Sequence, residues 1–391
     1  MSSLHSYTST FRSWFGYFCL GIAGSFAAVL WIEVTLRLVG YGSVAYLGYG
    51  SLQNNLQIPE LGYAGRPNLN GIQTQEGYSH LVLNDLGFHD VSHRQEKDAG
   101  VFRVAVLGNS HTMATQVETS ETYVSKLGEA LKGCHALQDN RVETLNFGIA
   151  GYTTSQDYLL LKEFVWKYSP DLIVLQDSPA IPQFEINEGE ISAHVTVDDD
   201  GRVNVDSSFL NSTTYKMRSS SSFTRFLATS DHSRALQYFN EFRRKLTKAR
   251  SNRFATASNS TPTNEHWEQR AKLLRAVSGI ARSHSTPIVV LLIPDGEAID
   301  PRNESGPARS NDERLWDRLG SDLAIPIINL TTDAWRFARQ NRLFLVGFGK
   351  QSGIGHMTRY GNDFFGRELA ARICNLLTSG GAADLERPTA G

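Results

Sequence analysis

The chain has 391 residues, a formal net charge of −2 and a hydrophobic content of 41%. This length suffices for one large domain or two ordinary ones, with a sizeable core. The balanced charge argues against a nucleic-acid-binding protein, which would carry a basic face. The three cysteines form no Cys-x-x-Cys pair and no cluster with histidine, so no metal site is expected.

The N-terminus carries a charge-free run of about 20 residues from Ser13 to Ile32, long enough to span a bilayer, with Trp14 and Trp31 near its ends. No Ala-x-Ala cleavage site follows, so we predict an uncleaved signal anchor at residues 13–35; a cleaved signal peptide is the alternative. Residues 1–12 would form a cytoplasmic tail. The protein would then be a single-pass protein of the cell membrane, with its large C-terminal part periplasmic or extracellular.

Two segments lack the periodicity of a packed domain. Residues 36–99 are rich in Gly, Tyr, Asn and Pro, and we expect an extended juxtamembrane segment there. Its end, residues 81–88, alternates like a short strand and then turns. Residues 379–391 are rich in Gly, Ala and Pro and are predicted to be a disordered tail.

Strand-like and helix-like patterns alternate over residues 100–378. Short apolar runs predict five strands, at residues 102–107, 144–147, 171–176, 287–294 and 325–330. Helical apolar stripes lie between them and after the last. This alternation predicts an α/β fold: a flavodoxin-like, three-layer α/β/α domain around a five-stranded parallel sheet. The first turn has no G-x-G-x-x-G, so a dinucleotide site is not predicted and no cofactor is expected.

Polar residues interrupt this alternation at about 185–262, which we interpret as an insertion covering the mouth of the crevice. It contains a possible hairpin, at residues 191–197 and 201–205, and a basic amphipathic helix near residues 233–250. The basic face of that helix either contacts a membrane surface or is simply solvated.

Ser110 directly follows the first predicted strand, where the ligand crevice of such sheets lies. It can be a nucleophile if a base reaches it, or merely a helix cap. His356, in the Gly-rich loop before the last helix, is the candidate base because both loops can meet at the same end of the sheet. The backbone N–H groups of Ser110 and Gly148 are the candidate oxyanion donors, since a glycine can approach closely.

Four motifs make residues 100–378 resemble the SGNH, or GDSL-type, hydrolases. They are Leu107–Thr112, Asn146–Tyr152, Pro170–Leu175 and Gly355–Asn362. The anchor together with Leu83-Asn84-Asp85-Leu86-Gly87-Phe88 looks like the membrane-anchored bacterial branch of that family. The resemblance implies Ser110 as nucleophile, His356 as base and Gly148 as the second oxyanion donor.

Three positions depart from the family pattern. Asn109 replaces the aspartate before the serine, and residues 176–180 lack the family's oxyanion asparagine. Gly353 and Ile354 stand where an aspartate usually precedes the histidine. Losing an oxyanion donor typically costs about 100–1,000-fold in turnover.

Two other carboxylates could orient His356 in place of the missing aspartate. Asp177 and Asp295 end the third and fourth predicted strands, although either could instead be a solvated turn residue or a helix cap. Asn109 and His111, on either side of the serine, are expected to line the pocket rather than to act as base.

The sequence therefore predicts a membrane-anchored serine esterase that cleaves small acyl esters through an acyl-Ser110 intermediate. Its partner would be an acylated small molecule or glycan, with O-acetyl groups of envelope glycans as one candidate. An O-acyltransferase acting on a polysaccharide and a catalytically eroded binding protein are the alternatives. Cys134 and Cys374 either pair in an oxidising compartment or remain buried free thiols, and the oligomeric state is left open.

Overall fold

The computed structural model divides the chain into two units, which are described separately. The larger unit spans residues 49–224 and 260–391, and the smaller comprises residues 1–48 and 225–259. Placement is described for residues 3–41, 56–73, 76–179, 192–223, 225, 232–239, 242–243, 246, 264–307 and 310–379.

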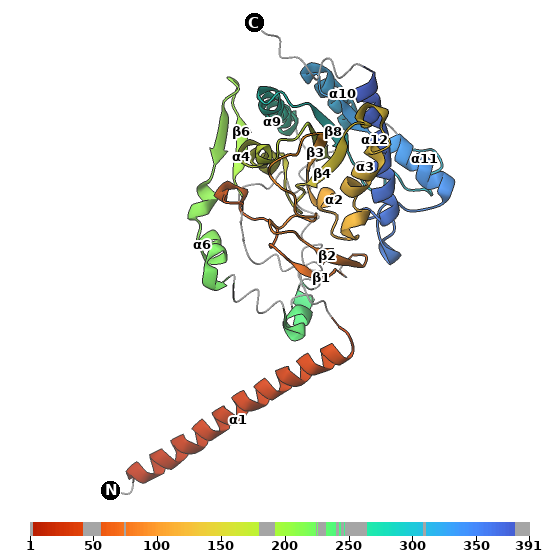
Figure 1. Cartoon of the computed structure of the whole chain (residues 1–391). Helices are drawn as coiled ribbons and strands as arrows, with labels where there is room; N and C mark the ends of the chain where they lie inside the picture. Colours follow the sequence, from red (N-terminus) through yellow and green to blue (C-terminus); the bar gives the residue numbers. More distant parts are fainter. Residues whose placement is uncertain are drawn as a thin grey trace. The chain divides into compact units, whose positions relative to one another are not determined.

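The larger unit is built on a five-stranded parallel sheet in the order β4-β3-β5-β8-β9. Figure 1 labels three of these strands, β3, β4 and β8. The strands are β3 (Val101–Leu107), β4 (Arg141–Asn146), β5 (Leu172–Asp177), β8 (Ile288–Leu292) and β9 (Ile327–Asn329). Numbered along the chain, these strands follow the flavodoxin-like order 2-1-3-4-5. The predicted fold class and all five predicted strands are confirmed.

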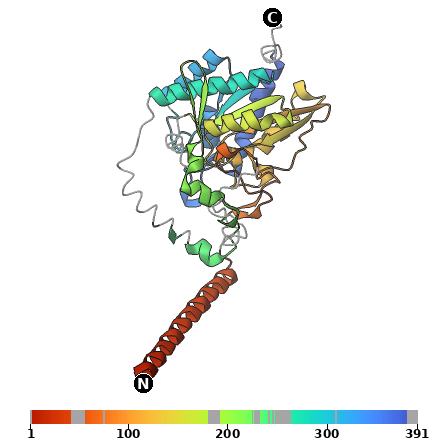
Figure 2. The ribbon, with the colours of Figure 1, turned by 90° about the vertical axis from the view of Figure 1, so that its left-hand side faces the viewer.

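Helices cover both faces of this sheet and give three layers (Figures 1 and 2). One face packs against α4 (Thr154–Glu163), α9 (Asn264–Ser283) and α10 (Asn311–Leu323), and the other against α3 (Tyr123–Leu131), α11 (Thr331–Asn341) and α12 (Arg359–Thr378). Successive residues of β3 supply the two cores: Ala105 faces α4 and α9, whereas Val104 and Val106 face α3 and α12. A strand buried on both faces reads as a continuous apolar run, which is why the sheet was predictable.

Residues 49–99 of the predicted juxtamembrane segment belong to the larger unit, contrary to the expectation of an extended linker. It contains the short helix η1 (Pro59–Leu61) and an antiparallel hairpin of β1 (Asn70–Gln73) and β2 (Ser79–Val82). Leu61 and Phe88 are fully buried in the core on the α4 side. The apolar residues are too widely spaced to give a periodic signal, yet they fill the space beside the sheet.

The remaining described elements are short. They are α2 (Ser110–Met113), α6 (Thr213–Ser219), the hairpin β6 (His194–Val197) and β7 (Val203–Asp206), and the 3-10 turns Thr119–Glu121, His135–Leu137, Val165–Tyr168, Ser208–Asn211 and Gly349–Gln351. The β6–β7 hairpin confirms the hairpin predicted in the insertion. Of the helix predicted near residues 233–250, residues 234–239, 242–243 and 246 are described and are helical. Other parts of the predicted crevice cover, at residues 185–191, 226–231 and 247–262, and the predicted tail beyond residue 379 lie outside the described residues.

A disulfide joins Cys134, after α3, to Cys374 in α12, so the two cysteines pair rather than remain free. The crosslink closes a loop with a sequence separation of 240 residues. Because it restricts the unfolded chain, we expect the Cys134→Ser/Cys374→Ser variant to lose about 2–4 kcal/mol of unfolding free energy. Urea titration measures this loss, and reductant should destabilise the unsubstituted protein but not the variant. Equal stability of both proteins without reductant would contradict the prediction.

The smaller unit contains the long helix α1 (Ser3–Leu38). Its segment Gly16–Leu38 has a mean hydropathy of 1.8 and is long and apolar enough to cross a membrane. A signal sequence would satisfy the same criteria of length and composition. The helix also includes most of residues 1–12, which the sequence suggested to be a polar tail.

Candidate active site

Ser110 and His356 lie side by side at the carboxyl end of the sheet. Ser110 Oγ is 2.8 Å from His356 Nε2, although 246 residues separate them in the sequence. Ser110 begins α2 directly after β3, and His356 lies in the loop before α12. The strand order reverses at β3, and ligand crevices of such sheets open at this point.

Glu76, in the turn of the β1–β2 hairpin, completes a chain of three side chains. Its Oε2 lies 2.6 Å from His356 Nδ1, and its Oε1 accepts the backbone N–H of His356 at 2.7 Å. A carboxylate beside Nδ1 places the ring proton on that nitrogen and leaves Nε2 as an acceptor facing Ser110. Both carboxylate oxygens bind one residue, so the imidazole is fixed relative to its own backbone.

The pKa of Glu76 keeps this carboxylate ionised at neutral pH. Burial alone would raise the pKa, but the hydrogen bonds from the ring and backbone of His356, together with nearby histidine charge, bring it below the ordinary value of 4.5. Such a group stabilises the folded state above its unfolded pKa, and this contribution is lost as the pH falls through the folded pKa.

The β1–β2 hairpin is fastened to the chain that follows Ser110. Ser79 Oγ donates to the carbonyl of Thr115 at 2.7 Å, and Glu118 Oε1 accepts the backbone N–H of His80 at 2.7 Å. These hydrogen bonds therefore link the hairpin that carries Glu76 to the segment that carries Ser110.

Neither of the two predicted orienting acids contacts His356 in the described structure. Asp177, at the end of β5, is buried and forms an ion pair with Arg270 Nη1 at 2.8 Å. Asp295 is exposed on the loop after β8. The prediction that Asp177 or Asp295 orients His356 is therefore wrong, because Glu76 holds the Nδ1 of His356.

Sequence reasoning missed Glu76 because residues 36–99 were placed outside the domain. A signal was nevertheless present: the chain has no carboxylate between residues 334 and 361, so any acid for His356 had to come from elsewhere. Glu76-Gly77 stands between two short strands, at a turn that can project a side chain.

The turn that carries Ser110 is held by side chains from neighbouring strands. Gln176 Oε1 accepts the backbone N–H of Asn109 at 3.2 Å and the hydroxyl of Thr112 at 3.1 Å. Asn109 Oδ1 accepts the N–H of His111 at 3.0 Å and so caps α2. Asn109 therefore shapes the turn through its side-chain oxygen.

Gly148 does not offer the oxyanion donor that the sequence suggested. Its N–H donates to Asn146 Oδ1 at 2.9 Å. A Cβ at Gly148 would lie 2.5 Å from the backbone nitrogen of Met113, so the glycine is needed for close packing against α2. The prediction correctly identified a close approach but assigned it to a ligand rather than to a helix.

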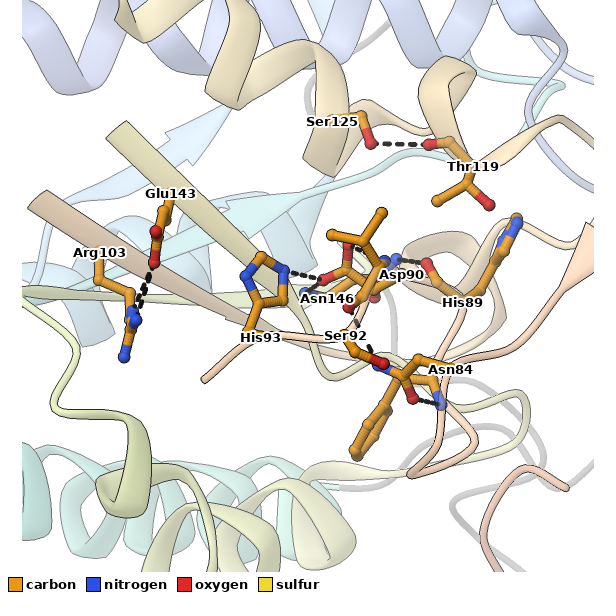
Figure 3. A network of polar contacts seen from close by, with 12 residues as sticks. Asn84, His89, Asp90, Ser92, His93, Arg103, Thr119, Ser125, Glu143 and Asn146 are labelled. Atoms are coloured by element: carbon orange, nitrogen blue, oxygen red, sulfur yellow. Dashed lines mark hydrogen bonds and ion pairs between the residues drawn. The ribbon is translucent and has the colours of Figure 1, made fainter. Parts of the chain in front are cut away.

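Asn146 belongs to a polar network with residues 84–93 (Figure 3), and it also contacts α2 through Thr112. Its amide donates to the carbonyls of His89, at 3.2 Å, and Thr112, at 2.9 Å, while Asp90 Oδ2 accepts its backbone N–H at 2.8 Å. His93 Nε2 lies 3.2 Å from the same Asp90 oxygen. This network joins residues 84–93 to the end of β4 and the base of the Ser110 helix.

In the loop after β4, the backbone N–H of Gly151 has no acceptor among the described residues. Other N–H groups of the loop are occupied: Phe147 donates to Val106 O, Gly148 to Asn146 Oδ1, Ile149 to Gly108 O, Ala150 to Met113 Sδ and Tyr152 to Ile149 O. Gly151 is exposed and has a φ of +82°, a conformation that favours glycine. The N–H of Ser110 likewise has no described acceptor, so these two donors are available at this end of the sheet.

His111 lies beside His356, with ring centroids 5.3 Å apart. Burial, reinforced by the charge of His356, lowers its pKa to about 3, so its imidazole is neutral at physiological pH. Its Nδ1 is buried without a hydrogen-bond partner in the described structure. His111 therefore neighbours the site, as expected, but His356 is the histidine that contacts Ser110.

No protein-family model matches this chain, and no curated protein matches it. The chain is similar to solved structures of esterases. An acetyl xylan esterase is 16% identical with a TM-score of 0.39, and the match covers 70% of this chain and 100% of that one. A two-domain esterase active on acetylated mannans is 11% identical with a TM-score of 0.39, covering 75% and 53% of the two chains. The psychrotrophic esterase EstA from Pseudoalteromonas sp. is 11% identical with a TM-score of 0.37, covering 70% and 98%.

Proposed function

We propose that this protein is an SGNH-type serine esterase that cleaves small acyl esters. The observation that carries the proposal is the hydrogen-bonded chain Ser110–His356–Glu76, with distances of 2.8 and 2.6 Å, at the carboxyl end of β3. A hydroxyl, an imidazole and a carboxylate in this order are the parts of a serine-nucleophile site, whatever their order in the sequence.

The proposed reaction proceeds in two steps. Ser110 Oγ attacks the acyl carbon while His356 Nε2 accepts its proton, and the alcohol leaves with that proton. Water then attacks the acyl-Ser110 ester, again with His356 as base, and releases the carboxylic acid. We assign the oxyanion of both tetrahedral intermediates to the N–H groups of Ser110 and Gly151.

Glu76 argues against one of the two alternative functions, a binding protein, but not against the other, an O-acyltransferase. The case for a binding protein rests on the absence of the family's orienting aspartate and oxyanion asparagine, and Glu76 supplies a carboxylate at His356. An O-acyltransferase would use the same residues with a glycan hydroxyl in place of water. Acetylated glycans remain our proposed substrate class, since they suit an enzyme held at a membrane.

We propose a cell-membrane location with the larger unit periplasmic or extracellular. The candidate span in α1 supports attachment, and the Cys134–Cys374 disulfide supports an oxidising compartment.

Labelling with a fluorophosphonate probe tests the function. We expect a single covalent adduct, which peptide mass spectrometry should locate on Ser110, because only an activated serine reacts at neutral pH. Prior denaturation should abolish labelling. A folded protein that stays unlabelled, or one labelled at another serine, would reject the proposal.

Gly355 offers a test of the carboxylate that does not change the carboxylate itself. Its φ is +98°, and a Cβ there would lie 2.1 Å from Glu76 Oε1. We expect Gly355→Ala to displace Glu76 and to lower kcat for p-nitrophenyl acetate by up to about 10⁴-fold, the cost of losing the orienting acid in a serine triad. The control is Gly201→Ala, at a β6–β7 turn glycine with a φ of +79° and open space around it, which should retain kcat. Unchanged kcat in Gly355→Ala would argue against a role for Glu76.

A further inference from the structure

A second feature of the chain lies in the smaller unit and is independent of the proposed active site. Residues 234–239, 242–243 and 246 are helical. Their large apolar side chains are exposed, at 44–61% of their full area: Leu236, Tyr238, Phe239, Phe242 and Leu246. At 100° per residue, these positions fall within one half of a helix circumference.

The orientation of this helix is the reverse of that of an ordinary surface helix. Gln237, which lies on the opposite, polar side, is only 3% exposed. A helix that packs on a protein core buries its apolar stripe and leaves its amides in water. Here the amide is covered and the aromatic side chains face outward, so the apolar stripe is available to a partner outside the chain.

The start of this helix is fastened to the end of α1. The Glu33 carboxylate accepts the backbone N–H groups of Arg234, at 3.0 Å, and Ala235, at 2.9 Å, as well as the Ser233 hydroxyl at 2.9 Å. Arg37 bonds both to Glu33, at 2.8 Å, and to the carbonyl of His232, at 2.9 Å. A carboxylate that binds several N–H groups at a helix start acts as its cap.

We propose that the helical residues 234–239, 242–243 and 246 form an interfacial helix, whose apolar stripe enters an anionic lipid bilayer beside the end of α1. Three observations favour lipid as the occupant. Tyr238 of the stripe packs against Tyr41, which follows α1, with ring centroids 5.6 Å apart, and the candidate span of α1 has no buried residues. Residues 233–250 contain six basic residues and one acidic residue, which suits anionic headgroups. Aromatic residues such as Tyr238 and Phe239 are typical of the headgroup boundary.

The test measures depth in the bilayer with the full chain. In a Cys19→Ser background, a single cysteine replaces Phe239 or Leu246 and carries an environment-sensitive fluorophore, while the native disulfide stays closed. The protein is reconstituted into phosphatidylcholine–phosphatidylglycerol vesicles with or without nitroxide-labelled lipid. The positive control is Trp31→Cys in α1, and the negative control is Val91→Cys, an exposed apolar position of the larger unit.

We expect nitroxide lipid to quench the probes at 239 and 246 at least about twofold more than the probe at 91. Omitting phosphatidylglycerol should weaken this difference. Quenching no greater than at position 91 would overturn the proposal, provided that the position 31 probe is quenched. A blue-shifted probe that lipid nitroxides do not quench would also overturn it, because a second copy or another protein would then cover the stripe. Far-UV circular dichroism establishes that each variant is folded.

Discussion

Replacing Ser110 by alanine is expected to lower kcat for p-nitrophenyl acetate by about 10⁵–10⁶-fold, as removal of a triad serine does. The reason is chemical, because alanine has no oxygen to form the acyl intermediate and His356 then has no proton to accept. Oxyanion donors and substrate binding would leave only a residual rate above that in water. Steady-state kinetics over a range of ester concentrations measures the change.

The matched control is Ser120→Ala, at an exposed serine of the same segment. It should keep kcat and KM within about twofold, since exposed substitutions rarely perturb a fold. Because the Ser110 side chain is only half-buried, Ser110→Ala should also unfold at the same urea concentration as the unsubstituted chain. If this folded variant kept more than about one hundredth of the activity, a different residue would be the nucleophile.

The sheet was predictable because its strands are buried on both faces. Val104-Ala105-Val106-Leu107 and the runs of β5 and β8 are apolar at consecutive positions, which few other environments require. The contact between Ser110 and His356 was a hypothesis that topology allowed but did not require. Ser110 follows strand β3, where crevices of such sheets lie, whereas His356 lies in the loop between helices α11 and α12.

The sequence did not predict the carboxylate Glu76 or the candidate oxyanion donor Gly151, because hydrophobic periodicity contains no information about either. Glu76 reaches His356 from a two-stranded hairpin of four-residue strands, too short for a clear alternating signal. The choice between Gly148 and Gly151 depends on which N–H already has an acceptor inside the loop. Which N–H groups are already occupied is set by the folded backbone of the loop and by side chains such as Asn146.

Replacing Glu76 by glutamine is expected to lower kcat by up to about 10⁴-fold with little change in KM. The two oxygens of Glu76 both accept hydrogen bonds from His356, one from the backbone N–H and one from Nδ1–H. A glutamine amide has a single acceptor oxygen, and its NH₂ group can only donate. Whichever way the amide turns, one of these contacts becomes a donor facing a donor, and the ring loses its orientation or its tautomer.

The control for this variant is Glu96→Gln, which removes one carboxylate charge at an exposed position and should keep kcat. A purely structural role for Glu76 would lower stability and leave the kcat of the folded fraction unchanged, so urea titration and kinetics are measured on the same sample. A kcat within about tenfold of that of the unsubstituted protein would mean that His356 keeps its tautomer without Glu76. Glu76→Asp separates charge from reach: the aspartate retains two acceptor oxygens but is one methylene shorter. If Glu76 positions the ring, Glu76→Asp should therefore lower kcat by less than Glu76→Gln does, but by more than Glu96→Gln does.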